Sequence, residues 1–188
     1  MATALQNAIV GELIGKQLTS VPASIISLTH FKTTKPEGTV LSRDSGLSDF
    51  YLYGMNSHPG YDCVDGSPFL FFDETDPRLL LMERVVAVTI GDTSVAVLLS
   101  VLEMERVVNY TIDRQGTAVF FKPGTLAAPD DSYIEASRYV GVTSVFDPNV
   151  NGQKLTSRLK CDDFMDDETA SQWNILGEAT QGPMKAAG

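Results

Sequence analysis

The sequence predicts a mainly β fold with a few short helices, a β-rich α+β domain in which consecutive hairpins form an antiparallel sheet or a partial barrel. Three observations support this prediction. Runs rich in β-branched and aromatic residues recur between residues 84 and 159. Turn signals containing Gly or Asn separate these runs. Stretches with a helical period are few and short. The 188 residues fit a single domain, with an N-terminal arm at residues 1–36 and a β-rich body at residues 37–188.

The N-terminal arm has a weak helical pattern. Apolar residues at positions 4, 5, 8, 9, 13 and 14 share one helical face, but Gly11 and Gly15 lower the helix propensity. Pro22 ends this pattern, and residues 23–28 are expected to open a short helix that leads to Phe31.

The segment after the arm is expected to be extended and then looped. Residues 39–41 predict a short strand. Residues 44–68 contain repeated Gly and Pro with aromatic residues between them, which indicates a long structured loop. Loops of this length in a compact domain are often functional.

Hairpin signals fill the body of the chain. Residues 84–90 and 93–97 flank Gly91-Asp92, and residues 107–112 and 118–121 flank a turn at residues 113–116. A further pair of strands, residues 142–146 and 154–159, flanks Asn151-Gly152, the strongest short turn signal in the chain. Residues 100–105, between the first two hairpins, predict one helical turn.

The net charge of -10 restricts the possible partners. Nucleic acid and anionic lipid both require clustered Lys and Arg, which this chain lacks. The acidic composition is explained either by a need for solubility, or by binding to a basic partner or to cations.

The longest apolar run, residues 95–99, is far shorter than the roughly 20 residues of a membrane-spanning helix, so no such helix is expected. The acidic run at residues 162–168 predicts a solvated turn, with a calcium site as the alternative.

The residues that usually carry catalysis are scarce. The two cysteines, Cys63 and Cys161, could form one disulfide with each other, and no Cys-x-x-Cys motif exists. The two histidines are too few for a tri-histidine site, although His58 with Asp62 and Cys63 leaves a metal site as the less favoured alternative. Nucleophile-elbow, P-loop and dinucleotide motifs are absent. We therefore expect no catalytic residue, no metal ion and no cofactor.

A set of short motifs runs in order along nearly the whole chain: Pro22-Ala23-Ser24, residues 40–46, residues 53–56 with 59–62, residues 82–86 and 106–109, Gly141 with residues 145–147, residues 167–174, Gly177, Gly182 and Pro183. Together these motifs resemble the prokaryotic family catalogued as domain of unknown function 3179. The resemblance implies an exported protein of unknown activity, and hence an extracytoplasmic location. Many members carry Cys-Pro-x-Cys where this chain has Lys122-Pro123-Gly124, so the chain resembles the branch without these thiols.

A short sequence pattern also occurs twice in the chain. Residues 8–13 and 179–184 share the pattern Ala-x-x-Gly-x-apolar. In the light of the resemblance, the first copy looks like the tail of a preceding half-repeat.

Six residues are the candidate ligand-binding residues: Arg43, Asp44, Asn56, Tyr61, Asn109 and Trp173. An Arg-Asp pair can grip an anion, or it can simply fix the start of a loop. A lone Trp can line a pocket or belong to the core. The family usually keeps Asn at position 109, so the resemblance implies a structural or site role for Asn109.

Two functions follow from these observations. The favoured one is a non-catalytic binding or scaffold domain, an extracytoplasmic accessory subunit that binds other protein chains. The alternative is a small-ligand-binding protein, or an enzyme of unknown reaction, with a pocket around Arg43, Asp44, Asn109 and Trp173.

Overall fold

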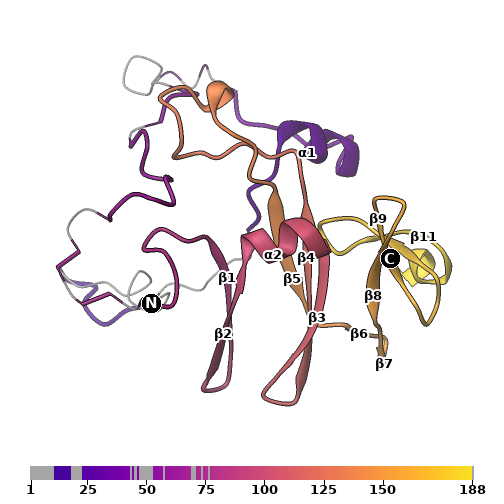
Figure 1. Cartoon of the computed structure of the whole chain (residues 1–188). Helices are drawn as coiled ribbons and strands as arrows, with labels where there is room; N and C mark the ends of the chain where they lie inside the picture. The colour runs from indigo at the N-terminus through magenta and orange to yellow at the C-terminus, as the bar shows by residue number, and fades with distance from the viewer. Residues whose placement is uncertain are drawn as a thin grey trace.

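The computed structural model describes residues 11–17, 23–42, 44, 46, 53–56, 58–68, 71–72, 74–75 and 77–187. The predicted fold class is confirmed, because strands make up 34% of the structure and helical segments 13%. Within the described ranges the strands form several antiparallel sheets and no closed barrel (Figure 1).

The first half of the β region holds two hairpins separated by a helix. In chain order, the elements from the N-terminus to Lys122 are α1 (Leu28–Thr34), β1 (Val85–Ile90), β2 (Thr93–Leu98), α2 (Leu99–Glu105), β3 (Val107–Ile112) and β4 (Gln115–Lys122). Both hairpins and the helical turn between them were predicted from the sequence. Asp113 and Arg114 alone make the β3–β4 turn, with φ of 44° and 67°, as a two-residue hairpin turn requires.

The second half contains shorter strands in a different pairing from the one predicted. Its elements are η2 (Ile134–Ala136), β5 (Val142–Phe146), β6 (Asn149–Val150), β7 (Gln153–Lys154), β8 (Ser157–Lys160), β9 (Asp163–Asp166), β10 (Gln172–Trp173), β11 (Ala179–Gln181) and η3 (Pro183–Ala187). The predicted turn at Asn151-Gly152 is present, but it joins only β6 and β7. The prediction that residues 142–146 pair with residues 154–159 is wrong, since β5 pairs with β4 and β8 pairs with β9. Pairing with β4 buries Val142 in the core.

Three other expectations are also corrected. Residues 39–41 form no strand, and Val40 and Leu41 are exposed. The short helix expected to start over residues 23–28 and lead to Phe31 begins only at Leu28, the last of these residues, because the Ser27 hydroxyl caps it by accepting a hydrogen bond from the His30 N–H. The acidic run is not a solvated turn, because residues 163–166 form β9 and Asp166 is fully buried. Positions 1–10 and Pro22 lie outside the described residues.

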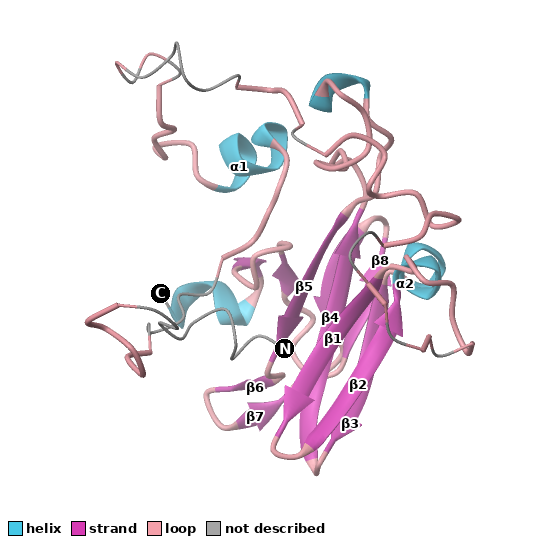
Figure 2. Ribbon diagram, turned by 90° about the vertical axis from the view of Figure 1, so that its left-hand side faces the viewer, coloured by secondary structure: helices cyan, strands magenta, loops and turns pink. Residues whose placement is uncertain are grey.

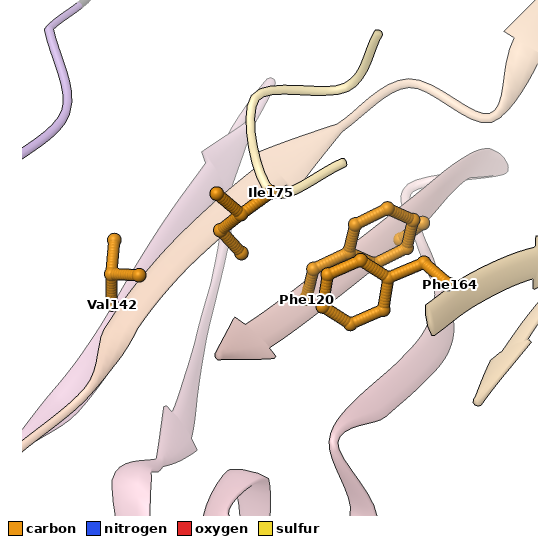
Figure 3. Close-up of a cluster of buried hydrophobic side chains, with 5 residues drawn as sticks. Phe120, Val142, Phe164 and Ile175 are labelled. Carbon is orange, nitrogen blue, oxygen red and sulfur yellow. The ribbon is translucent and has the colours of Figure 1, made fainter. Parts of the chain in front are cut away.

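Strand β4 is the centre of the molecule because both of its faces are buried. Successive side chains of a strand point to opposite faces. Ala118 and Phe120 pack with Val142, Phe164 and Ile175 in one cluster, shown in Figure 3. On the other face, Val119 and Phe121 pack with Leu102 of α2, and the β1–β2 hairpin contributes Val86 and Val97. The hairpin accordingly runs alongside the β3–β4–β5 sheet (Figure 2).

The C-terminal sheet has the strand order β11-β10-β9-β8 and covers the face of β4 that carries Ala118 and Phe120. Phe164 of β9 stacks on Phe120 of β4, with ring centroids 4.4 Å apart and an interplanar angle of 16°. This ring pair joins the two sheets across the core.

Candidate functional site

The long Gly- and Pro-rich loop is held in place by a buried carboxylate between two arginines. Asp62 Oδ1 accepts a hydrogen bond of 2.7 Å from Arg84 Nε, and Asp62 Oδ2 accepts one of 2.6 Å from Arg84 Nη2. Arg138 Nη2 lies 3.1 Å from the same Oδ2 and also donates to the Asp62 carbonyl. This two-point geometry is the strongest form of an arginine–carboxylate pair. Neither Arg84 nor Arg138 was predicted as a partner of Asp62, because no local sequence pattern links them to it.

Backbone contacts extend this attachment along residues 54–60. The Asn56 N–H donates to the Ser132 carbonyl at 2.9 Å, and the Gly60 N–H donates to the Asp130 carbonyl at 2.6 Å. An isolated antiparallel bridge joins Met55 to Tyr133. The described residues 54–56 and 58–62 of the loop therefore form a structural layer against residues 130–138.

Substituting Asp62→Asn is expected to lower the free energy of unfolding by about 2 kcal/mol, because it leaves a partly buried Arg84 without a charged acceptor. Limited proteolysis should then cut residues 53–66 faster than in the wild type. Glu103→Gln, which removes an exposed carboxylate on α2, is the control and should change neither measurement. Unchanged cleavage in Asp62→Asn would contradict this role.

A cleft of about 420 Å³ lies beside this ion-pair cluster. Residues 23–25, 125–129 and 140–143 line it, together with Arg84 and Leu99. Most of these side chains are apolar, but the Thr125 hydroxyl is buried and has no hydrogen-bond partner among the described residues. Mainly apolar clefts of this size with a few polar groups are typical of small-ligand sites.

Asn109 connects two sheets. Its Nδ2 donates to the Ser157 carbonyl at 2.6 Å, and its Oδ1 accepts from the Ser157 N–H at 3.0 Å. The side chain thus imitates a β-ladder between β3 and β8. Both ends of the amide are occupied, so in this conformation Asn109 acts as a clamp.

Trp173 belongs to a buried polar network around Asp166. The Asp166 carboxylate accepts from Trp173 Nε1 at 2.9 Å, from Thr169 Oγ1 at 2.9 Å and from the Thr169 N–H at 2.5 Å. Thr169 Oγ1 also contacts Ser171 Oγ at 2.8 Å. Burial alone would raise the pKa of Asp166, but the hydrogen bonds from Trp173, Thr169 and the backbone outweigh it and hold the pKa below its usual value. A carboxylate that keeps its charge in this way stabilises the turn between β9 and β10.

The other four candidate ligand-binding residues lie away from Asn109 and Trp173 in the sequence, between residues 43 and 61. Asp44 is exposed, and its N–H donates to Ser42 Oγ at 3.1 Å. Asn56 accepts from the His58 N–H at 2.8 Å. Tyr61 lines an open cleft of about 230 Å³ with His58 and Met82. Arg43 lies outside the described residues.

Of the five candidates among the described residues, no two line the same one of these five clefts. Asn109 lines one of about 230 Å³, and Trp173 lines two others, of about 90 Å³ and 180 Å³. Ligand binding by the six residues stays a prediction.

Across the described positions, no three His, Cys, Asp or Glu side chains gather in a way that could hold a metal ion. Both cysteines are exposed and are not joined to each other. Within the part of the chain that the structure describes, no helix is long and apolar enough to cross a membrane.

The described residues define a class of protein: a layered antiparallel β domain with a mainly apolar cleft beside a buried ion-pair cluster. The chain belongs to the family described as "Protein of unknown function (DUF3179)", whose family model matches residues 2–187. No curated protein and no solved structure was found to match the chain.

Proposed function

We propose that this chain is a non-catalytic binding domain, an accessory subunit that acts outside the cytoplasm as part of a larger protein assembly. The observation that supports it is an apolar segment, defined as Phe71, Phe72, Leu79, Leu80 and Leu81, in which every side chain is exposed. Phe72 is 90% exposed and Leu80 is 56% exposed. Soluble monomers rarely expose large contiguous apolar patches, and we expect these five side chains, which are close together in the sequence, to form an interaction surface of that kind.

The composition of this segment favours a protein partner. Aromatic residues, Phe among them, are enriched in the cores of protein interfaces, whereas charged residues are depleted there. The proposed extracytoplasmic location rests on the resemblance to exported members of the family.

The experiment is to purify the native particle and measure its mass by light scattering and its composition by mass spectrometry. We expect a particle that contains other protein chains. A Phe72→Ser/Leu80→Ser variant should keep the wild-type melting temperature but lose these chains, whereas the control Tyr110→Ser, at an exposed aromatic residue of β3, should retain them. A native wild-type particle that contains one chain and nothing else would overturn the proposal.

The cleft beside Arg84 favours a second candidate, a small-ligand-binding domain. The ligand would place an apolar body against residues 125–129 and a hydrogen-bonding group at the Thr125 hydroxyl, which has no partner among the described residues. A ligand from a panel of small apolar acids and alcohols should then raise the melting temperature of the wild type, and Thr125→Val should abolish the rise. A panel that leaves the wild type unchanged would count against this candidate.

A further inference from the structure

A cleft of about 180 Å³ lies between the first helix and the C-terminal sheet. Helix α1 and strands β4, β9, β10 and β11 all contribute to its walls, which include His30, Thr34, Lys122, Asp163, Trp173 and Thr180. We call it the α1 cleft. Every residue that lines it belongs to the described part of the chain. The functions proposed above use other places, residues 71–81 and the cleft beside Arg84.

Two contacts hold α1 beside the C-terminal sheet. Lys35, which caps the helix, forms an ion pair with Glu178, and Glu178 Oε2 also accepts a hydrogen bond of 3.0 Å from Asn174 Nδ2. Both partners of the ion pair are half-exposed, so the pair alone contributes little stability. Ile26, just before the helix, adds an apolar anchor because it packs against the buried cluster that contains Phe164. The walls of the α1 cleft are therefore positioned by contacts outside the cleft itself.

The α1 cleft contains one positive and one negative side chain, and neither of them has a counter-ion. Lys122 is half-buried and Asp163 is exposed. Neither forms an ion pair with a described residue. Opposite charges that line one cleft without pairing are complementary to a ligand that carries both charges.

The threonine hydroxyls of the cleft are available only as acceptors. Thr33 Oγ1 donates its hydrogen to the Thr29 carbonyl at 2.9 Å, and Thr180 Oγ1 donates to the Gln172 carbonyl at 3.3 Å. A hydroxyl that has used its hydrogen still has lone pairs to offer. With the carboxylate of Asp163, these oxygens supply acceptors that suit an ammonium group.

His30 adds a polar but uncharged group to the wall. Burial, together with the positive charge of Lys122, lowers the pKa of His30, so the imidazole is neutral at pH 7. Its Nδ1 is buried and has no hydrogen-bond partner among the described residues. An unpaired buried polar atom costs free energy, which a polar ligand atom at this nitrogen offsets. Lys122 is therefore the only positive charge in the lining of the α1 cleft.

We propose that the α1 cleft binds a small zwitterionic amino acid, whose carboxylate pairs with Lys122 and whose ammonium group pairs with Asp163. Lys122 disfavours a metal cation, and Asp163 disfavours a dianion such as phosphate. The volume of about 180 Å³ equals the space of about six liquid water molecules and is smaller than the roughly 300 Å³ of a drug-sized site. The ligand is therefore small, and its carbon chain lies against Trp173 and Ile175.

The test is isothermal titration calorimetry of the full chain at pH 7 with glycine, L-alanine, 3-aminopropionate and 4-aminobutyrate, which differ in the spacing of their two charges. At least one of them should bind. The carboxylate and the amine of matching length, which carry one charge each, should bind at least about tenfold more weakly, because each loses one charge-assisted hydrogen bond. Inorganic phosphate should not bind.

Two substitutions assign the binding to this cleft. Lys122→Met keeps the apolar stem and removes the charge, and Asp163→Asn keeps the shape of an exposed side chain. Each should weaken binding of the amino acid at least about tenfold. Lys32→Met, at an exposed residue of α1 outside the cleft, and Glu103→Gln on α2 are the matched controls and should leave the affinity unchanged. Asp163→Asn decides the question if Lys122→Met fails to fold.

Three results overturn the proposal: no binding by any of the four amino acids, equal or tighter binding of phosphate or of a ligand with one charge, and unchanged affinity in Asp163→Asn. The variants Phe72→Ser/Leu80→Ser and Thr125→Val should bind the amino acid as the wild type does. Their behaviour separates this inference from both functions proposed above.

Discussion

Substituting Phe164→Ala is expected to lower the free energy of unfolding by about 3–5 kcal/mol, which is the usual cost of deleting a buried aromatic ring. Phe164 is 2% exposed and stacks on Phe120, so the change opens a cavity between the C-terminal sheet and β4. Urea unfolding followed by circular dichroism measures the effect. The loss should appear as a lower midpoint with an unchanged slope.

Two controls separate the cavity from the loss of an aromatic residue. Phe72→Ala makes the same chemical change at a side chain that is 90% exposed, and it should cost less than about 0.5 kcal/mol. Phe164→Leu refills most of the volume and should cost clearly less than Phe164→Ala. Equal losses at positions 164 and 72 would show that the ring pair does not join the two sheets.

Substituting Asp166→Asn is expected to lower the free energy of unfolding at pH 7 by about 3 kcal/mol. The carboxylate accepts hydrogen bonds from Trp173 Nε1 and from both the hydroxyl and the N–H of Thr169, whereas an amide would turn its own donor toward one of them. Asp163→Asn, at the exposed start of the same strand, is the matched control and should change little.

The depressed pKa of Asp166 gives this prediction a pH dependence with a defined sign. The folded state holds the carboxylate more strongly than the unfolded state does. The stabilisation is therefore complete above the unfolded pKa of about 3.9 and is lost as the pH falls through the lower folded pKa. Unfolding measured between pH 7 and pH 3 should show a steeper acid loss in the wild type than in Asp166→Asn. Parallel losses in the two proteins would contradict this role of the carboxylate.

Local signals were sufficient for the fold class and for most turns. Runs of β-branched residues around Gly91-Asp92 and around residues 113–116 specified both of the first hairpins, because a short turn and its flanking strands are contiguous in the chain. The second turn is shorter than predicted, since Gln115 and Gly116 belong to β4. The helical turn predicted at residues 100–105 is also present, as α2 (Leu99–Glu105), because the signals that start and end a short helix are local in sequence. The family resemblance needed only the order of short motifs, and the matching family model covers residues 2–187.

Contacts between distant residues decided the rest. The turn at Asn151-Gly152 was correctly read, yet β5 pairs with β4, because burying Val142 against Ile175 and Phe120 is worth more than extending a local hairpin. Asp166 reads as one more acid in a charged run, and only its burial beneath Trp173 makes it a structural carboxylate. The ion pairs of Asp62 with Arg84 and Arg138 span 22 and 76 positions of the chain. Sequence patterns report only on residues that are neighbours along the chain, whereas desolvation and hydrogen bonding act between residues that are neighbours in space. The spatial contacts therefore determined which charged side chains this protein buries.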